Sequence, residues 1–113
     1  MASVRLEKVA SLLKRELSLS FQRGMNIHYQ GVMITVTQVR VSPDLGLAKV
    51  YLSFFPAEKR ASTLELVQNR TVLIRKELAA EVAKQLRKVP DLAFYLDDSL
   101  DYFEEIDRLL KGD

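Results

Sequence analysis

Residues 32–55 constrain the fold most, because they contain two strand-like runs joined by one short turn. Residues 32–42 are rich in Val, Ile and Thr, and residues 48–55 alternate apolar with other side chains, which is typical of a strand with one buried face. Between the runs, Pro43 restricts φ, Asp44 can hydrogen-bond nearby backbone, and Gly46 is expected to supply a positive φ. The segment therefore predicts a β-hairpin.

The first strand of this hairpin changes the phase of its alternation. Ile34 and Val36 fall on one face, whereas Val39 and Val41 fall on what should be the other. One extra residue in the strand would restore a single apolar face. We therefore expect a β-bulge near Thr37–Gln38.

An amphipathic helix is predicted before the hairpin. Residues 3–21 carry apolar side chains at the i, i+3, i+4, i+7 spacing, with Ser3 as a plausible N-cap and Gly24 as a plausible stop. Residues 25–31 are expected to form a loop. The apolar stripe comprises Leu6, Val9, Leu13 and Leu17.

Residues 60–89 contain no glycine or proline and predict helix up to Pro90. A single straight helix would place Leu73 almost opposite the other apolar side chains. Asn and Thr compete for local backbone hydrogen bonds, so a break at residues 69–71 and two successive helices are favoured. The apolar positions are Leu64, Val67, Ile74, Leu78, Val82 and Leu86.

A third strand and a last helix complete the expected order. Leu92, Phe94 and Leu96 alternate as a strand does, and residues 99–111 form an acidic amphipathic stretch capped by Asp98 or Ser99. The order α-β-β-α-α-β with a C-terminal helix predicts one α+β domain over residues 1–113. Its helices would pack on a small mixed three-stranded sheet.

Composition favours a folded cytoplasmic protein without metal–thiolate chemistry. The 113 residues suit one domain, no apolar run approaches the roughly 20 residues that span a bilayer, and there is no cysteine. Charge is uneven: residues 1–58 have 7 basic and 4 acidic side chains (+3), residues 59–88 have 8 and 3 (+5), and residues 89–113 have 2 and 8 (−6). This asymmetry favours a body that faces a polyanion, although a solvated mixture of surface charges is the alternative.

Three stretches in this order resemble the ribosome-binding factor A family of bacterial small-subunit assembly factors. They are "LLKREL" in the first helix, "TVTQVRVSPDLGLAKVYLSFF" over residues 35–55, and "LRKVPDLAFYLDDSLD" over residues 86–101. The resemblance implies a type II KH-like fold, binding to immature small subunits and 16S rRNA, and a role in late rRNA processing. The sequence itself has no P-loop, no GxGxxG and no nucleophile motif, so neither a cofactor nor catalysis is expected.

Two departures from the family pattern affect what can be carried over. The family's Ala-x-Gly kink between the paired helices is matched here by Arg70-Thr71-Val72, which admits a phosphate backbone less closely than glycine does. The Asp-Pro-Arg segment often found before the first strand is replaced by "IHYQG". Any role of that segment is therefore not transferred.

Basic side chains are the main candidates for RNA contact, because Lys and Arg neutralise phosphates and release counterions. A solvated helix face is the alternative for each of them, and Asn69 and Thr71 could simply cap or kink the helix. The first tier is Arg70, Arg75, Lys76, Lys84, Arg87 and Lys88, and the second tier is Arg5, Lys8, Lys14, Arg15, Asn69 and Thr71.

Other chemistry is poorly supported. Tyr51 and Phe55 could stack on bases, but such residues are more often covered by another element. The acids Asp97, Asp98 and Asp101 are more typical of helix caps than of a metal site, and His28 has no identifiable partner. We therefore predict a monomeric non-enzyme, with an assembly GTPase or subunit completion as candidates for its release. The alternative is a protein-interaction module that uses the acidic C-terminal helix without RNA.

Overall fold

The computed structural model describes residues 4–99 and begins with a long helix, α1 (Val4–His28). Its buried face carries Val9, Leu13, Leu17 and Phe21, so the predicted stripe is confirmed. The predicted stop at Gly24 and the loop expected directly after it are wrong, because the helix continues for another turn. Gly24 is buried, and a Cβ there would lie 3.3 Å from Tyr29 Cε2 and 3.2 Å from His28 Cδ2.

The helix ends at His28, and the chain then leaves it through two residues with positive φ, Gln30 (55°) and Gly31 (78°). The Gly31 N–H donates to the Met25 carbonyl at 2.8 Å, which satisfies one of the free carbonyls of the last turn. Gly24 is therefore needed for close packing on Tyr29, whereas Gly31 supplies the left-handed end of the helix.

The hairpin is formed by β1 (Met33–Val41) and β2 (Leu47–Phe55), which pair antiparallel. The register shifts between Val36 and Gln38, which confirms the predicted bulge. β3 (Asp91–Leu96) pairs in parallel with β2, so the sheet is mixed and has the order β1-β2-β3. The short 3₁₀ turn η1 (Ala57–Lys59) follows β2.

Leu45, and not Gly46, adopts the positive φ in the hairpin turn, at 60°. The Gly46 N–H is held by Asp44 Oδ1 at 2.9 Å and Ser42 Oγ at 3.2 Å, and the Gly46 carbonyl accepts from the Asp91 N–H at 3.0 Å. The expected hydrogen bonding of Asp44 is therefore confirmed. Glycine is suited to position 46 because a Cβ would lie 3.1 Å from Asp44 Oδ1.

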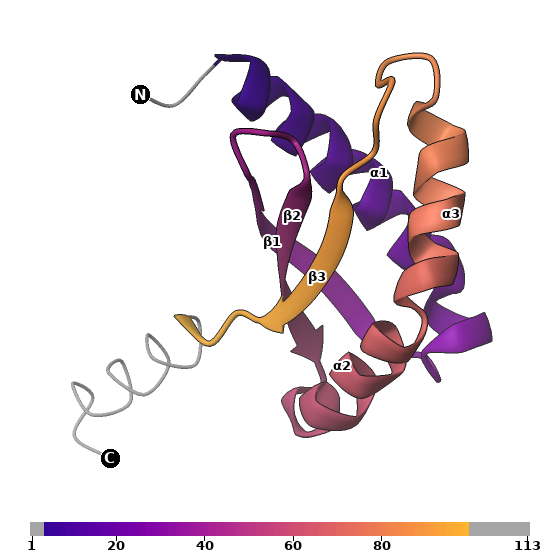
Figure 1. The fold of residues 1–113 in the computed structure, drawn as a ribbon. Helices are drawn as coiled ribbons and strands as arrows, with labels where there is room; N and C mark the ends of the chain where they lie inside the picture. Colours follow the sequence, from indigo (N-terminus) through magenta and orange to yellow (C-terminus); the bar gives the residue numbers. More distant parts are fainter. Residues whose placement is uncertain (1–3, 100–113) are drawn as a thin grey trace.

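The predicted break in the second helical region is confirmed, with α2 (Arg60–Asn69) and α3 (Thr71–Val82) meeting at Arg70. The predicted extent of α3 is wrong, because the helix ends at Val82 rather than near Pro90. The Gln85 and Leu86 N–H groups both donate to the Val82 carbonyl at 2.9 Å. Residues 83–90 then turn back toward the start of α1 (Figure 1).

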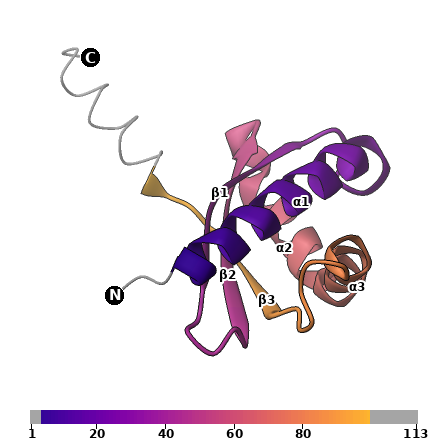
Figure 2. The same ribbon diagram turned by 90° about the horizontal axis from the view of Figure 1, so that it is seen from above.

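The helices pack on one face of the sheet, with α1 crossing it and the α2–α3 pair beside α1 (Figures 1 and 2). The core between these layers combines Leu13, Leu17 and Phe21 of α1 with Val50 and Leu52 of β2. Val67, Ile74, Leu78 and Val82 of the helix pair join the same cluster. The predicted α+β architecture is confirmed, while the C-terminal helix expected at 99–111 lies almost entirely outside the described residues.

Candidate nucleic-acid interface

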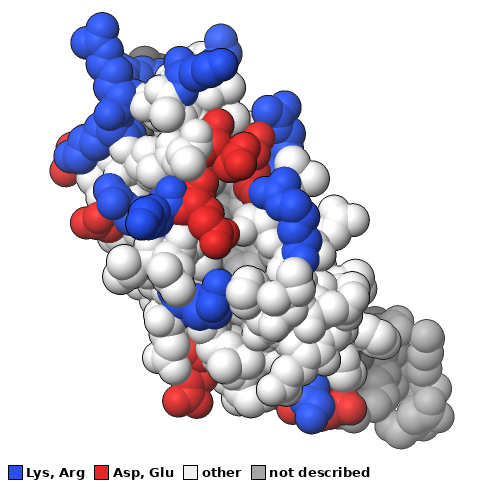
Figure 3. All heavy atoms as spheres, turned by 90° about the vertical axis from the view of Figure 1, so that its right-hand side faces the viewer, with Lys and Arg blue, Asp and Glu red and all other residues white. Residues whose placement is uncertain are grey.

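A basic groove lies at the end of the molecule where the start of α1, the hairpin turn and the loop after α3 meet. Its volume is about 640 Å³. Lys and Arg side chains gather at the upper end of the face that includes α3 (Figure 3). The groove is lined by Val4, Arg5, Lys8, Val9, Leu12, Leu45, Gln85, Leu86, Arg87 and Lys88.

Four cationic side chains line this groove: Arg5 and Lys8 from α1, and Arg87 and Lys88 from the loop. None of its lining residues is acidic. Asp44 stands in the hairpin turn, and its pKa is lowered mainly by the Ser42 hydroxyl and the Gly46 N–H, with a smaller contribution from the positive charge of Lys88. The groove therefore concentrates positive charge at one end of the fold.

The floor of the groove is apolar. Val9 is buried, and Leu12, Leu45 and Leu86 are partly buried against the core. Leu45 reaches the floor from a left-handed backbone position that a branched side chain rarely adopts. The arrangement therefore offers cations around a non-polar surface, which fits a ligand with an anionic backbone and a flat apolar part.

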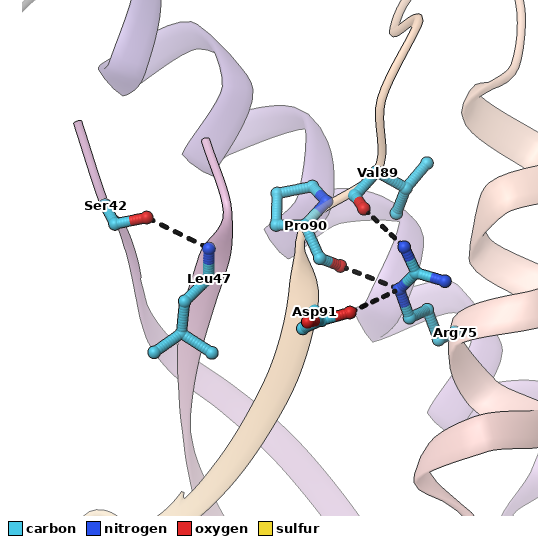
Figure 4. Close-up of polar contacts among 6 residues, drawn as sticks. All are labelled: Ser42, Leu47, Arg75, Val89, Pro90 and Asp91. Atoms are coloured by element: carbon cyan, nitrogen blue, oxygen red, sulfur yellow. Dashed lines mark hydrogen bonds and ion pairs between the residues drawn. The ribbon is translucent and has the colours of Figure 1, made fainter. Parts of the chain in front are cut away.

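The loop that supplies Arg87 and Lys88 is held by Arg75 of α3 (Figure 4). Arg75 Nη2 donates to the Val89 carbonyl at 2.6 Å, and Nε donates to the Pro90 carbonyl at 3.1 Å. Nε also lies 3.4 Å from Asp91 Oδ1. Arg75 thus bonds within the chain through Nε and Nη2 and is 40% exposed, and its contact with RNA stays a prediction.

Other predicted side chains lie outside the groove. Lys76 in α3 and Lys84 just after it are exposed, and neither lines the groove. Lys14 donates to the Thr37 carbonyl at 3.3 Å, across from α1 to the bulge in β1. Arg15 pairs with its neighbour Glu16 at 3.2 Å.

The α2–α3 junction is also remote from the groove. Thr71 Oγ1 donates to the Gln68 carbonyl at 2.7 Å, which ties the first residue of α3 to the last turn of α2 and fits a kink at the junction rather than a helix cap. Arg70 is half-buried, and its Nε is buried without a hydrogen-bond partner. Burial raises the pKa of the Tyr29 phenol, and the adjacent Arg70 guanidinium partly opposes this rise. Asn69 is exposed at the end of α2.

The basic groove was predicted from sequence only in part. Arg87 and Lys88 of the first tier and Arg5 and Lys8 of the second tier come together, although they were predicted separately. The apolar floor was not predicted, because the sequence places Val9 and Leu86 only on helical stripes. The early end of α3 decides this difference, since it turns Leu86 toward α1.

The acidic and histidine candidates are placed away from this groove. His28 lies in the last turn of α1 against the Tyr29 ring, with centroids 6.0 Å apart. Asp97 accepts hydrogen bonds from the Ser99 and Thr37 hydroxyls, and these lower its pKa. Within residues 4–99, no group of three or more His, Cys, Asp or Glu is placed to hold a metal ion. No helix in this range is long and apolar enough to cross a bilayer.

Comparisons with known proteins agree on one family. The model of the family "Ribosome-binding factor A" matches residues 5–110. Ribosome-binding factor A of Flavobacterium psychrophilum is 42% identical over 113 residues, covering 99% of this chain and 87% of the relative.

Structures from the same family share the fold. The crystal structure of ribosome-binding factor A from Thermus thermophilus has a TM-score of 0.66 and 25% identity, covering 80% of this chain and 94% of that one. A Thermus thermophilus homology model fitted into a cryo-EM map of a 30S complex has a TM-score of 0.64 and 27% identity, covering 79% and 91%. The α-β-β-α-α-β order and mixed sheet are those of the KH-like fold implied by the sequence. The chain therefore belongs to the ribosome-binding factor A family.

Proposed function

We propose that this protein binds the small ribosomal subunit during assembly and contacts 16S rRNA through the basic groove. The observation that carries the proposal is the convergence of Arg5, Lys8, Arg87 and Lys88 around an apolar floor. Support for the target comes from the related Thermus thermophilus protein, which was fitted into a map of a 30S complex. Phosphates would be neutralised at the rim while an unstacked nucleotide contacts the floor.

The proposed mechanism is binding without covalent chemistry. A factor of this kind holds or displaces an rRNA segment in immature particles, and so assists late processing and maturation of the rRNA. It would act as a cytoplasmic monomer over residues 1–113 as one domain. Its release would be driven by completion of the subunit or by an assembly GTPase, because a ligand shifts an equilibrium only through a difference in affinity between two states.

Cosedimentation with immature and mature small subunits tests this function. We expect preferential retention on immature particles that weakens as salt rises. The groove variant Lys8→Gln/Arg87→Gln/Lys88→Gln should reduce the slope of log K against log salt by about 2, since each lost phosphate contact removes about 0.7–0.9.

A matched control removes the same charge elsewhere, in Arg23→Gln/Lys59→Gln/Lys76→Gln. All three side chains are exposed and lie outside the groove, so this variant should keep most of the salt dependence. Equal losses in the two variants would show that net charge, and not the groove, is responsible. Absence of the wild-type protein from both particles at low salt would refute subunit binding itself.

A further inference from the structure

The outer face of the sheet, opposite the helices, carries aromatic and cationic side chains in adjacent rows. Gln38 of β1, Tyr51 of β2 and Tyr95 of β3 are partners in one row, and Arg40 and Lys49 are partners in the row next to it. Tyr95 is 43% exposed, and Phe55 at the other end of β2 is 67% exposed. Among the described residues, the helices lie on the opposite face and leave this one uncovered (Figure 2).

The two tyrosine rings form a pair next to a positioned cation. Their centroids are 5.6 Å apart with the ring planes at 30°, and the Arg40 guanidinium carbon lies 5.9 Å from the centre of the Tyr51 ring. With its amide oxygen turned toward Arg40, Gln38 accepts from the guanidinium at 2.9 and 3.3 Å. The sheet therefore presents a guanidinium and two aromatic rings side by side, with Tyr95 exposed and Tyr51 half-buried. Aromatic rings and guanidinium planes are groups on which bases stack.

The charges around this pair favour an anionic ligand. Arg40 and Lys49 are both exposed beside the rings. Acids stand toward the ends of this face: Asp91 pairs with Arg75, Asp97 accepts from Ser99 and Thr37, and Glu58 lines a hollow with Phe55. A cationic row next to aromatic rings matches the alternation of phosphates and bases in a single strand.

We propose that this outer face is a second nucleic-acid surface, which binds unpaired RNA by stacking bases on Tyr51 and Tyr95 while Arg40 and Lys49 contact the phosphates. This surface is separate from the basic groove, because none of its residues lines that groove. The proposal reaches beyond subunit binding through the groove, and it can be tested with RNA alone. Duplex RNA would bind less well, since its bases are already stacked on one another.

The test is a fluorescence anisotropy titration of the full chain with a labelled oligouridylate of about 12 nucleotides, a length within the usual site size for single strands. Tyr51→Ala/Tyr95→Ala should weaken binding about 10-fold or more for each ring that stacks on a base. Tyr51→Phe/Tyr95→Phe keeps both ring faces and should bind within about 3-fold of wild type. Arg40→Gln leaves the rings in place and should mainly reduce the salt slope, by about 0.7.

An oligomer of the same length with abasic sites supplies the control for stacking. It should bind the wild-type protein more weakly, and the alanine pair should then cause no further loss. Circular dichroism and urea unfolding check that the sheet of the alanine pair is intact. If that variant fails to fold, the abasic oligomer still tests stacking on the wild-type protein.

Several outcomes would overturn the proposal. Full oligouridylate affinity in the alanine pair would do so, as would equal binding of the abasic oligomer. If the alanine pair keeps its RNA affinity but loses cosedimentation with small subunits, the face contacts ribosomal protein and the RNA assignment is wrong. If the wild-type protein does not sediment with subunits but binds oligouridylate through the tyrosines, the proposed function fails and this inference stands.

Discussion

Replacing Arg75 with methionine should mainly lower the stability of the fold, rather than remove a direct contact with RNA. The long side chain of methionine keeps most of the packing along α3 but removes the donors that hold Val89 and Pro90. These carbonyls lie in the segment that carries Arg87 and Lys88 and leads into β3. The variant therefore tests whether Arg75 is a structural clamp, as its contacts indicate, or a phosphate ligand, as its charge suggests.

The size of the effect follows from the two carbonyl contacts. A hydrogen bond to a charged group contributes about 1.5–3 kcal/mol, but the Arg75 side chain is 40% exposed, so water can replace part of each bond. The pair with Asp91 adds little, because that carboxylate is 80% exposed. We therefore expect Arg75→Met to lower the free energy of unfolding by about 2 kcal/mol in total.

Urea unfolding at neutral pH measures this change. With an m-value of about 1–3 kcal/mol/M, the midpoint should fall by about 1 M. Lys76→Met is the matched control, because Lys76 is the next residue, is exposed and has no partner among the described residues. Its unfolding free energy should stay within about 0.5 kcal/mol of wild type. An unchanged midpoint in Arg75→Met, together with a reduced salt slope for RNA, would refute the clamp.

Two further predictions concern the core and the end of α1. Leu17 is fully buried, whereas Leu19 on the same helix is 41% exposed. Urea unfolding should therefore show that Leu17→Ala lowers the free energy of unfolding by about 2–5 kcal/mol and that Leu19→Ala changes it by less than about 0.5 kcal/mol. Similar losses in the two variants would contradict the assigned helix face. Burial raises the pKa of Tyr29 above its ordinary value of 10.0, so the contribution of this phenol to stability is complete below about pH 10 and is lost as pH rises through the folded-state pKa. Unfolding measured up to and beyond pH 10 should therefore be less pH-dependent in Tyr29→Phe than in wild type, by at most about 1.4 kcal/mol per pH unit, and parallel curves would show that Tyr29 ionises equally in both states.

The elements with strong periodic signals could be predicted from sequence. Side chains in a strand alternate between two faces with a period of two residues. This period predicts the buried faces of β2 and β3, and a change in its phase predicts the bulge in β1. The break at Arg70 was predicted at the right place, but the argument from Leu73 was wrong, because this side chain stays 51% exposed after the break. These features depend on neighbours along the chain, which a single sequence records.

The ends of α1 and α3 depended on tertiary contacts instead. A glycine often ends a helix, but α1 continues past Gly24. The Tyr29 ring packs close to Gly24, in space that a side chain at position 24 would need. Likewise, α3 ends at Val82 although no glycine or proline follows before Pro90. The carbonyls of Val89 and Pro90 find a donor in Arg75 only after this loop has turned back, and no local pattern reports that contact.

The basic groove arises where the fold departs from the simplest local expectations. Leu45 takes the left-handed conformation although a glycine stands next to it, and the early end of α3 turns Leu86 toward α1. A leucine with positive φ is less stable than a glycine at such a position, so packing around it must compensate for the strain. Sites at which local preference gives way to a particular surface are where function is expected. The groove meets this criterion at the hairpin turn and at the loop after α3. At the α2–α3 junction, Thr71 donates to the Gln68 carbonyl and Arg70 contacts Tyr29, while Arg70 Nε is buried without a partner.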